Sequence, residues 1–225
     1  MKTHLGVLVL VAIGAAALFV PLRPGVAAGD HGGCKGSLPA SGQTTPYTAD
    51  TQASLGATVP DDGTVQAGAA LRYKDNGDGT IKDLNTGLMW EKKVAGSGCL
   101  HCVEDTYPWS QFGSTTIWDW LAAVNAEGGR GFAGHGDWRI PNVKELQSIL
   151  DYGRVNPALD PIFGPTVITR YYWSSTTAAN PDTGGNVAWV VFFHDGHVLS
   201  TPFGFQEGAK NGSWHVRAVR GGCTR

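Results

Sequence analysis

Apolar residues recur at helical spacing in two stretches of the chain, and a residue that can cap a helix precedes each of them. The first stretch, residues 116–126, begins at Thr116, has Asp119 at the third helical position, and is followed by Gly128 and Gly129. A hydroxyl at the cap and an acid three residues later satisfy free backbone N–H groups, and glycine often ends a helix. The pattern therefore predicts a helix with an apolar face of Ile117, Trp120, Leu121 and Val124.

The second stretch follows Pro141, which pushes the preceding Ile140 toward extended geometry. Asn142 can cap a helix at this point, and Glu145 can complete a capping box. Gly153 offers a stop. We predict a helix between these residues, with an apolar face of Val143, Leu146, Ile149 and Leu150.

Shorter apolar segments between turn residues predict strands. Residues 75–79, DNGDG, are typical of a hairpin turn, and residues 85–87 indicate a second turn. Residues 187–193 are apolar at nearly every position, which predicts a central strand covered on both faces. The predicted strands are residues 72–74, 80–83, 88–91, 171–177, 187–193, 198–200 and 214–219.

The hairpin turn also resembles a Ca²⁺-binding loop. An EF-hand needs oxygen ligands at alternate positions and a glutamate at the twelfth. With Asp75 as the first position, Gly77 and Gly79 occupy the third and fifth, and Thr86 the twelfth. We therefore interpret the segment as a plain turn.

The N-terminal residues have the composition of a secretory signal. Lys2 opens a short polar start, residues 5–20 are almost wholly apolar, and small residues lead up to Ala28. We expect residues 1–28 to be removed and the protein to be periplasmic, extracellular or at the cell surface. The alternative is a retained membrane anchor, which the short apolar run and Pro21 disfavour. No stable membrane span is then expected.

Charge and composition narrow the class of protein. Removal of residues 1–28 takes two of the 17 basic residues and none of the 19 acidic ones, so the net charge becomes −4. This balance argues against binding of nucleic acid by overall charge. Residues 29–70 are rich in small polar residues and predict an extended, poorly ordered arm. Residues 71–222 are predicted to form one domain with an aromatic-rich core.

The four cysteines suggest two disulfides in an oxidising compartment. Three connectivities are open, and we favour Cys34–Cys223 together with Cys99–Cys102. The segment CLHC, residues 99–102, could instead be a redox or zinc site. However, Pro108 follows soon after it, and the chain lacks a second CxxC. A structural disulfide is the preferred interpretation.

Five short words, taken together, resemble the Lcl C-terminal domain family: DNGDGT, TGLMW, GDWRIPN, YWSST and VRAVRGG. The resemblance covers about residues 71–222. It implies a C-type-lectin-like fold, in which two helices pack on loop-rich antiparallel sheets in an α+β architecture. The predicted order of hairpin, helix, helix and sheet is similar.

The resemblance also implies a function. The best-known member of the family is a bacterial adhesin that binds sulfated glycans. In that adhesin the domain is joined to a collagen-like repeat, which this chain lacks. We expect a non-enzymatic binding or adhesion module for an extracellular glycan or a cell-surface protein. Guanidinium groups match sulfate, and aromatic rings stack on sugars. The expected ligand-binding residues are Arg170, Tyr171, Tyr172, Trp189, His194, His197 and Arg217.

A basic patch is expected to surround these residues, formed by Arg220, Lys210 and His215 together with the arginines and histidines just named. The alternative interpretation places Arg217 and Arg220 at alternate, solvent-facing positions of a strand.

Asn180-Pro181-Asp182 lies between two predicted strands, about where sugar-binding C-type lectins carry part of a Ca²⁺ site. Asn180 and Asp182 are the candidate ligands, and Ca²⁺ is the one cofactor considered. The later Asn-Asp pair of those lectins is missing here, and Asn-Pro is also a common turn starter.

Two other functions stay open. One is a divergent oxidoreductase related to formylglycine-generating enzymes, although those enzymes use paired cysteines near the C-terminus and this chain has only Cys223 there. The other is a structural subunit of a cell-surface assembly. No catalytic residues are assigned.

Overall fold

The computed structural model describes residues 38–46, 60–179, 184–200 and 208–222. The expected signal peptide, the pair Cys34 and Cys223, and the candidate Ca²⁺ ligands Asn180 and Asp182 lie outside these ranges. The described residues belong to one structural unit.

A few short helices and several antiparallel sheets make up the described residues, so the predicted α+β class is confirmed. The helices are α1 (Asp62–Val65), α2 (Ile117–Ala126) and α3 (Val143–Gln147), with 3₁₀ turns η2 (Glu127–Gly129), η3 (Phe132–Gly134) and η4 (Pro161–Phe163). The strands are β1 (Tyr73–Asp75), β2 (Thr80–Asp83), β3 (Met89–Glu91), β4 (Tyr107–Pro108), β5 (Tyr172–Thr177), β6 (Ala188–Phe192), β7 (His197–Leu199), β8 (Ser213–Trp214) and β9 (Val219–Arg220).

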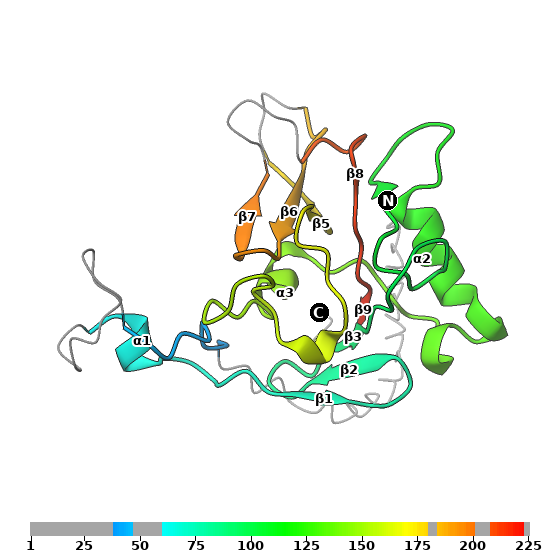
Figure 1. Cartoon of the computed structure of the whole chain (residues 1–225). Coiled ribbons are helices and arrows are strands. Elements are labelled where there is room, and N and C mark those ends of the chain that lie inside the picture. Colours follow the sequence, from blue (N-terminus) through cyan, green and yellow to red (C-terminus); the bar gives the residue numbers. More distant parts are fainter. Residues whose placement is uncertain (1–37, 47–59, 180–183, 201–207, 223–225) are drawn as a thin grey trace, which may run out of the picture. The chain divides into compact units, whose positions relative to one another are not determined.

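One sheet has the strand order β1-β2-β3-β9 (Figure 1). The predicted hairpin joins β1 to β2, and side chains of the turn bind its backbone. Asp75 Oδ1 accepts a hydrogen bond from Gly77 N, and Asp78 Oδ1 accepts one from Thr80 N. The predicted hairpin is therefore confirmed.

A second sheet has the order β5-β6-β7, and β4 pairs with β8. The C-terminal segment links these strands to the first sheet. Near its start, His215 forms a parallel bridge with Tyr172 of β5. Near its end, Val219 pairs with Trp90 of β3. One stretch of chain therefore holds the two sheets together.

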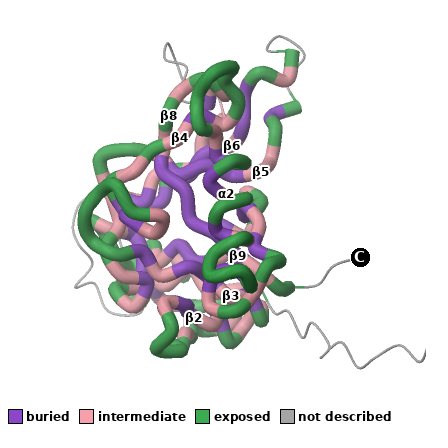
Figure 2. The backbone as a smooth tube through the Cα atoms, turned by 90° about the vertical axis from the view of Figure 1, so that its right-hand side faces the viewer, coloured by how far each residue is buried: buried purple, intermediate pink, exposed green. Residues whose placement is uncertain are grey.

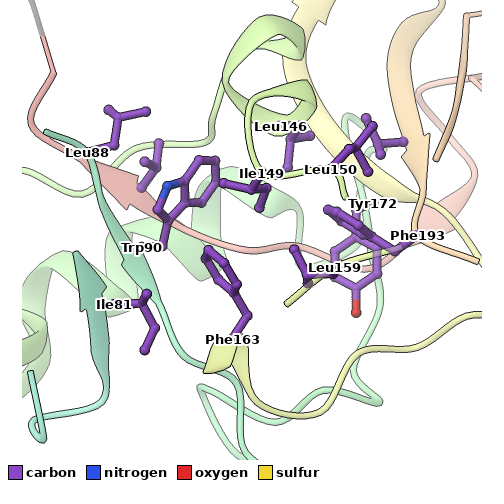
Figure 3. Close-up of a cluster of buried hydrophobic side chains, with 12 residues drawn as sticks. Ile81, Leu88, Trp90, Leu146, Ile149, Leu150, Leu159, Phe163, Tyr172 and Phe193 are labelled. Carbon is purple, nitrogen blue, oxygen red and sulfur yellow. The ribbon is translucent and has the colours of Figure 1, made fainter. Parts of the chain in front are cut away.

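Strand β6 is covered on both faces, as predicted. Val191 and Phe193 pack with Trp90, Phe163 and apolar residues of α3 and of the segment that follows it (Figure 3). Ala188 and Val190 face a second cluster, whose other members come from α2, from residues 132–140 and from the C-terminal segment. Figure 2 shows the exposed side of α2 next to largely buried strands.

The predicted helix at 116–126 is confirmed as α2. Thr116 and Asp119 form the expected capping box, and Ile117, Trp120 and Val124 are buried. The capping box of Asn142 and Glu145 is also confirmed. However, α3 ends at Gln147 rather than near Gly153, because Leu150 turns away to form a bridge with Leu159.

The predicted last strand, residues 214–219, is interrupted. Within this segment only β8 and β9 pair as strands. Between them, some polar groups bind side chains or carbonyls of other segments instead of a neighbouring strand. Ala218 N donates to the Glu91 side chain at 2.8 Å, and the Arg217 side chain points inward. In the expected arm, residues 29–70, the described parts contain α1 and a parallel bridge between Pro39 and Ala69.

Candidate functional site

A buried ion-pair cluster lies where β3 meets the end of α2. It consists of Glu91, Lys93, His101 and Glu127. Glu91 Oε1 lies 2.8 Å from Lys93 Nζ and 2.8 Å from His101 Nδ1. The other ring nitrogen of His101 lies 3.1 Å from Glu127 Oε2. A charge can remain buried when it is paired in this way.

Burial and pairing act in opposite directions on these groups. Burial alone would raise the pKa of Glu91, but Lys93 and His101 lower it to about 2. Burial would lower the pKa of His101, but Glu91 and Glu127 raise it above its ordinary value. Burial lowers the pKa of Lys93, and Glu91 only partly offsets this effect. The arrangement keeps Glu91 ionised.

The Glu91–Lys93 pair at the centre of the cluster is enclosed, whereas Glu127 at its edge is exposed. Glu91 and Lys93 have at most 3 % of their surface exposed, and Lys93 Nζ sits 4.7 Å from the centre of the Trp120 ring. The Glu91–Lys93 pair therefore supports the fold.

The predicted disulfide between Cys99 and Cys102 is present and carries His101 within its loop. Val103 N donates to Val94 O at 3.0 Å, and Trp120 Nε1 donates to Leu100 O at 2.8 Å. These bonds hold the loop against α2. The disulfide thus pins the segment that positions His101.

A surface group of aromatic rings, which we call the aromatic strip, consists of Tyr171, Phe192, His194 and Trp214. All four are half-buried. The Tyr171 ring centre lies 5.1 Å from that of Phe192 and 5.5 Å from that of Trp214. Phe192 and His194 are stacked at 5.5 Å. Rings that already pack on one another offer a pre-arranged apolar surface to a ligand.

Two of the predicted ligand-binding residues belong to this strip, and Arg170 directly precedes it as an exposed residue. Phe192 and Trp214 were not predicted. Their signal was the position of Phe192 next to the end of the predicted strand 187–193, and of Trp214 at the start of the predicted strand 214–219. Sequence spacing alone did not show that β6 and β8 lie on either side of Tyr171.

Tyr172 and Arg217, predicted to contact ligand, are instead buried. The Tyr172 hydroxyl accepts a hydrogen bond from Val167 N at 3.0 Å, and its ring packs on Phe193. Arg217 Nη1 donates to Glu91 O at 2.7 Å and to Phe163 O at 3.0 Å. The prediction for these two residues was wrong, because both side chains complete the core.

The alternative, with Arg217 and Arg220 both facing solvent, is also wrong for Arg217, which is 1 % exposed. Arg220 is half-buried, and its Nε lies 2.7 Å from Asp137 Oδ1.

The remaining expected residues do not form one basic patch. His215 is buried, with Nδ1 3.1 Å from Asp105 O. His197 Nδ1 lies 2.8 Å from Asp195 Oδ1. Trp189 lies on the opposite face of β6 from Phe192 because side chains alternate along a strand. Lys210 packs on a ring outside the aromatic strip, with Nζ 3.9 Å from the Trp109 ring centre.

Among the described residues, no group of three or more histidine, cysteine, aspartate or glutamate side chains is arranged to hold a metal ion. Asn180 and Asp182 fall outside them, so their proposed role remains a prediction.

The charges of the buried ion-pair cluster were missed by sequence reasoning. Glu91 and Lys93 are two residues apart and so share one side of an extended segment, which was the available signal. Their burial depends on Ala218, far along the chain.

No helix in the described ranges combines the length and apolar character needed to cross a membrane.

Comparison with known proteins identifies a family but no individual relative. No curated protein matches the chain, and no solved structure matches it. The model of the Lcl C-terminal domain family matches residues 79–220, which is more than half of the 225 residues. This range includes strands β2 to β9, helices α2 and α3, and most of the words that carried the resemblance. The chain therefore belongs to the Lcl C-terminal domain family.

Proposed function

We propose that this protein is a secreted, non-enzymatic binding module of C-type-lectin-like fold that recognises an extracellular glycan through the aromatic strip. The observation that carries the proposal is the contact of Tyr171 with both Phe192 and Trp214 on a half-exposed surface. Aromatic faces stack on the apolar faces of sugar rings, and polar tips can bind their hydroxyl groups.

The exposed guanidinium of Arg170 favours a sulfated glycan within this class. Its Nη1 donates to Thr169 O at 3.0 Å, and Arg170 directly precedes Tyr171 of the strip in the chain. Guanidinium groups bind sulfate through paired hydrogen bonds, and His194 adds a second polar group at the other end. Ca²⁺ at Asn180 and Asp182 is a separate part of the proposal.

A glycan array with residues 29–225 tests this function in Ca²⁺, with a chelator and at raised salt. We expect binding of sulfated glycans that falls with salt, because the contact between Arg170 and sulfate is screened. A loss on chelation would instead assign binding to Asn180 and Asp182. The absence of binding under every condition would overturn the proposal and favour a protein ligand or an assembly role.

Two variants locate the surface. Arg170→Gln should weaken binding and reduce its salt dependence, and it should leave the fold intact because Arg170 is exposed. Tyr171→Ala should weaken binding about tenfold, which corresponds to the loss of one buried ring contact. The control is Phe112→Ser, which removes a fully exposed ring outside the strip. Thermal unfolding of each variant separates lost contact from lost fold.

A further inference from the structure

Residues 109–118, which comprise the loop after β4 and the first two residues of α2, expose an aromatic ring at the tip of the loop. Phe112 is fully exposed. The turn that presents it is closed by Ser114 N donating to Gln111 O at 3.4 Å, and Gly113 has a φ of 76°. Figure 1 shows this connection extending away from the strands beside α2. A large apolar side chain held in water at a turn is available for contact with a partner.

The base of the loop carries two tryptophans. The rings of Trp109 and Trp118 meet edge to face at 4.8 Å, and Trp118 is 39 % exposed. Trp109 is fixed because its Nε1 donates to Ser174 O at 3.1 Å. Tryptophan favours the boundary between water and the apolar part of a bilayer, since its ring is apolar and its N–H is polar.

The tip of this loop is uncharged, and charged side chains lie only near its base. Residues 106–118 include no aspartate, glutamate, lysine, arginine or histidine. Asp105 and Asp119 flank this stretch. A cation, Lys210, lies at its base, with Nζ 3.9 Å from the Trp109 ring centre and donating to Thr177 Oγ1 at 2.9 Å. The order is an apolar tip, then two tryptophans, then a cation. This order matches the acyl, interfacial and phosphate levels of a lipid surface.

We propose that residues 109–118 form a lipid-contacting loop that inserts Phe112 among the acyl chains of the bilayer leaflet it contacts. Lipid fits this loop better than sugar does, because the Phe112 side chain has no hydrogen-bonding group and the uncharged loop loses little hydration on insertion. One ring and one cation give reversible attachment rather than a permanent anchor. The loop is separate from the aromatic strip, so the inference goes beyond glycan binding.

The test is co-sedimentation of the chain without residues 1–28 with phosphatidylcholine vesicles, alone and mixed with phosphatidylglycerol. Phe112→Ser should lower vesicle partitioning about tenfold or more, as expected for loss of one buried phenyl group. Phe112→Leu should keep most of the binding, because the bilayer requires an apolar group but not a ring. Lys210→Gln should remove any preference for the anionic vesicles.

Val155→Ser is the matched control, since Val155 is 61 % exposed and lies outside the loop. It should partition like the wild type. The proposal is overturned if the wild type does not bind vesicles, or if Phe112→Ser binds them as well as the wild type does. Reduced glycan binding by Phe112→Ser without any vesicle binding would assign the loop to the glycan surface. Vesicle binding without glycan binding would support the loop and contradict the proposed function.

Discussion

His101 lies between two carboxylates: its Nδ1 is 2.8 Å from Glu91, and its Nε2 is 3.1 Å from Glu127. Its ring also packs on Phe132 at 4.0 Å. One side chain therefore connects β3, the disulfide loop and the end of α2. The protonation of this residue is therefore expected to contribute to how the stability of the domain responds to pH.

Replacement of His101 should change the slope of stability against pH. The pKa of His101 is raised in the folded state, so its charged form stabilises the fold below about pH 6.5, the ordinary histidine pKa. That stabilisation is lost as pH rises through the raised pKa. In urea titrations at several pH values, His101→Gln should remove this loss above pH 6.5. An unchanged slope would contradict a charged His101.

His215 should act in the opposite direction. Burial lowers its pKa, so the unfolded chain binds a proton more readily than the folded one does. Its neutral form is compatible with the fold, and stability should fall as pH drops below about 6.5. Stability of His215→Gln should decline less on acidification than that of the wild type. The double variant with His101→Gln should be less sensitive to pH than either single variant when the ranges above and below about pH 6.5 are taken together.

Loss of the Glu91 charge should be strongly destabilising. Glu91→Gln leaves Lys93 buried without its carboxylate, which typically costs about 3–5 kcal/mol of unfolding free energy. Chemical denaturation at neutral pH measures the change. Glu104→Gln is the matched control, because Glu104 is exposed, and it should change stability by less than about 0.5 kcal/mol. Equal stabilities of the two variants would show that the buried pairing contributes little.

Arg217 should matter for stability rather than for ligand contact. Arg217→Lys cannot reproduce both bonds from Nη1 to the carbonyls of Glu91 and Phe163. We expect a loss of about 2–3 kcal/mol, as for hydrogen bonds from a charged donor. Arg170→Lys, at an exposed position, should leave the unfolding free energy unchanged. If Arg217→Lys instead weakened glycan binding at full stability, its burial would be contradicted.

The Cys99–Cys102 disulfide should stabilise its loop locally. The closed loop is short, with a sequence separation of 3. Chain entropy then predicts a contribution of about 2 kcal/mol. In the double variant Cys99→Ser with Cys102→Ser, amide exchange should quicken at Val94 and Val103, while the amides of β6 stay protected. Uniform loss of protection across both regions would contradict a local role.

Local signals were readable from the sequence, and distant pairings were not. The capping boxes of α2 and α3 depend on residues three positions apart, so Thr116 with Asp119 and Asn142 with Glu145 were predicted correctly. The length of α3 was not, because Leu150 follows its bridge to Leu159 rather than its helical pattern.

The candidate site shows the same division. The aromatic character of residues 171–173 was plain, but both faces of β5 are covered at Tyr172 and Trp173, while Tyr171, just before the strand, is only half-buried. Arg217 sits between two predicted strand residues, and its inward position depends on carbonyls contributed by Glu91 and Phe163. Pattern alone could not supply those partners.

The C-terminal segment that joins the two sheets also sets the order of assembly. Until residues 213–220 have been synthesised, β3 and β5 lack their pairing partners, Val219 and His215 respectively. Contacts that span so much sequence form slowly, because a long loop must close before they contribute. We therefore expect the two sheets to be joined late in folding, once the C-terminal segment is available to pair with both of them.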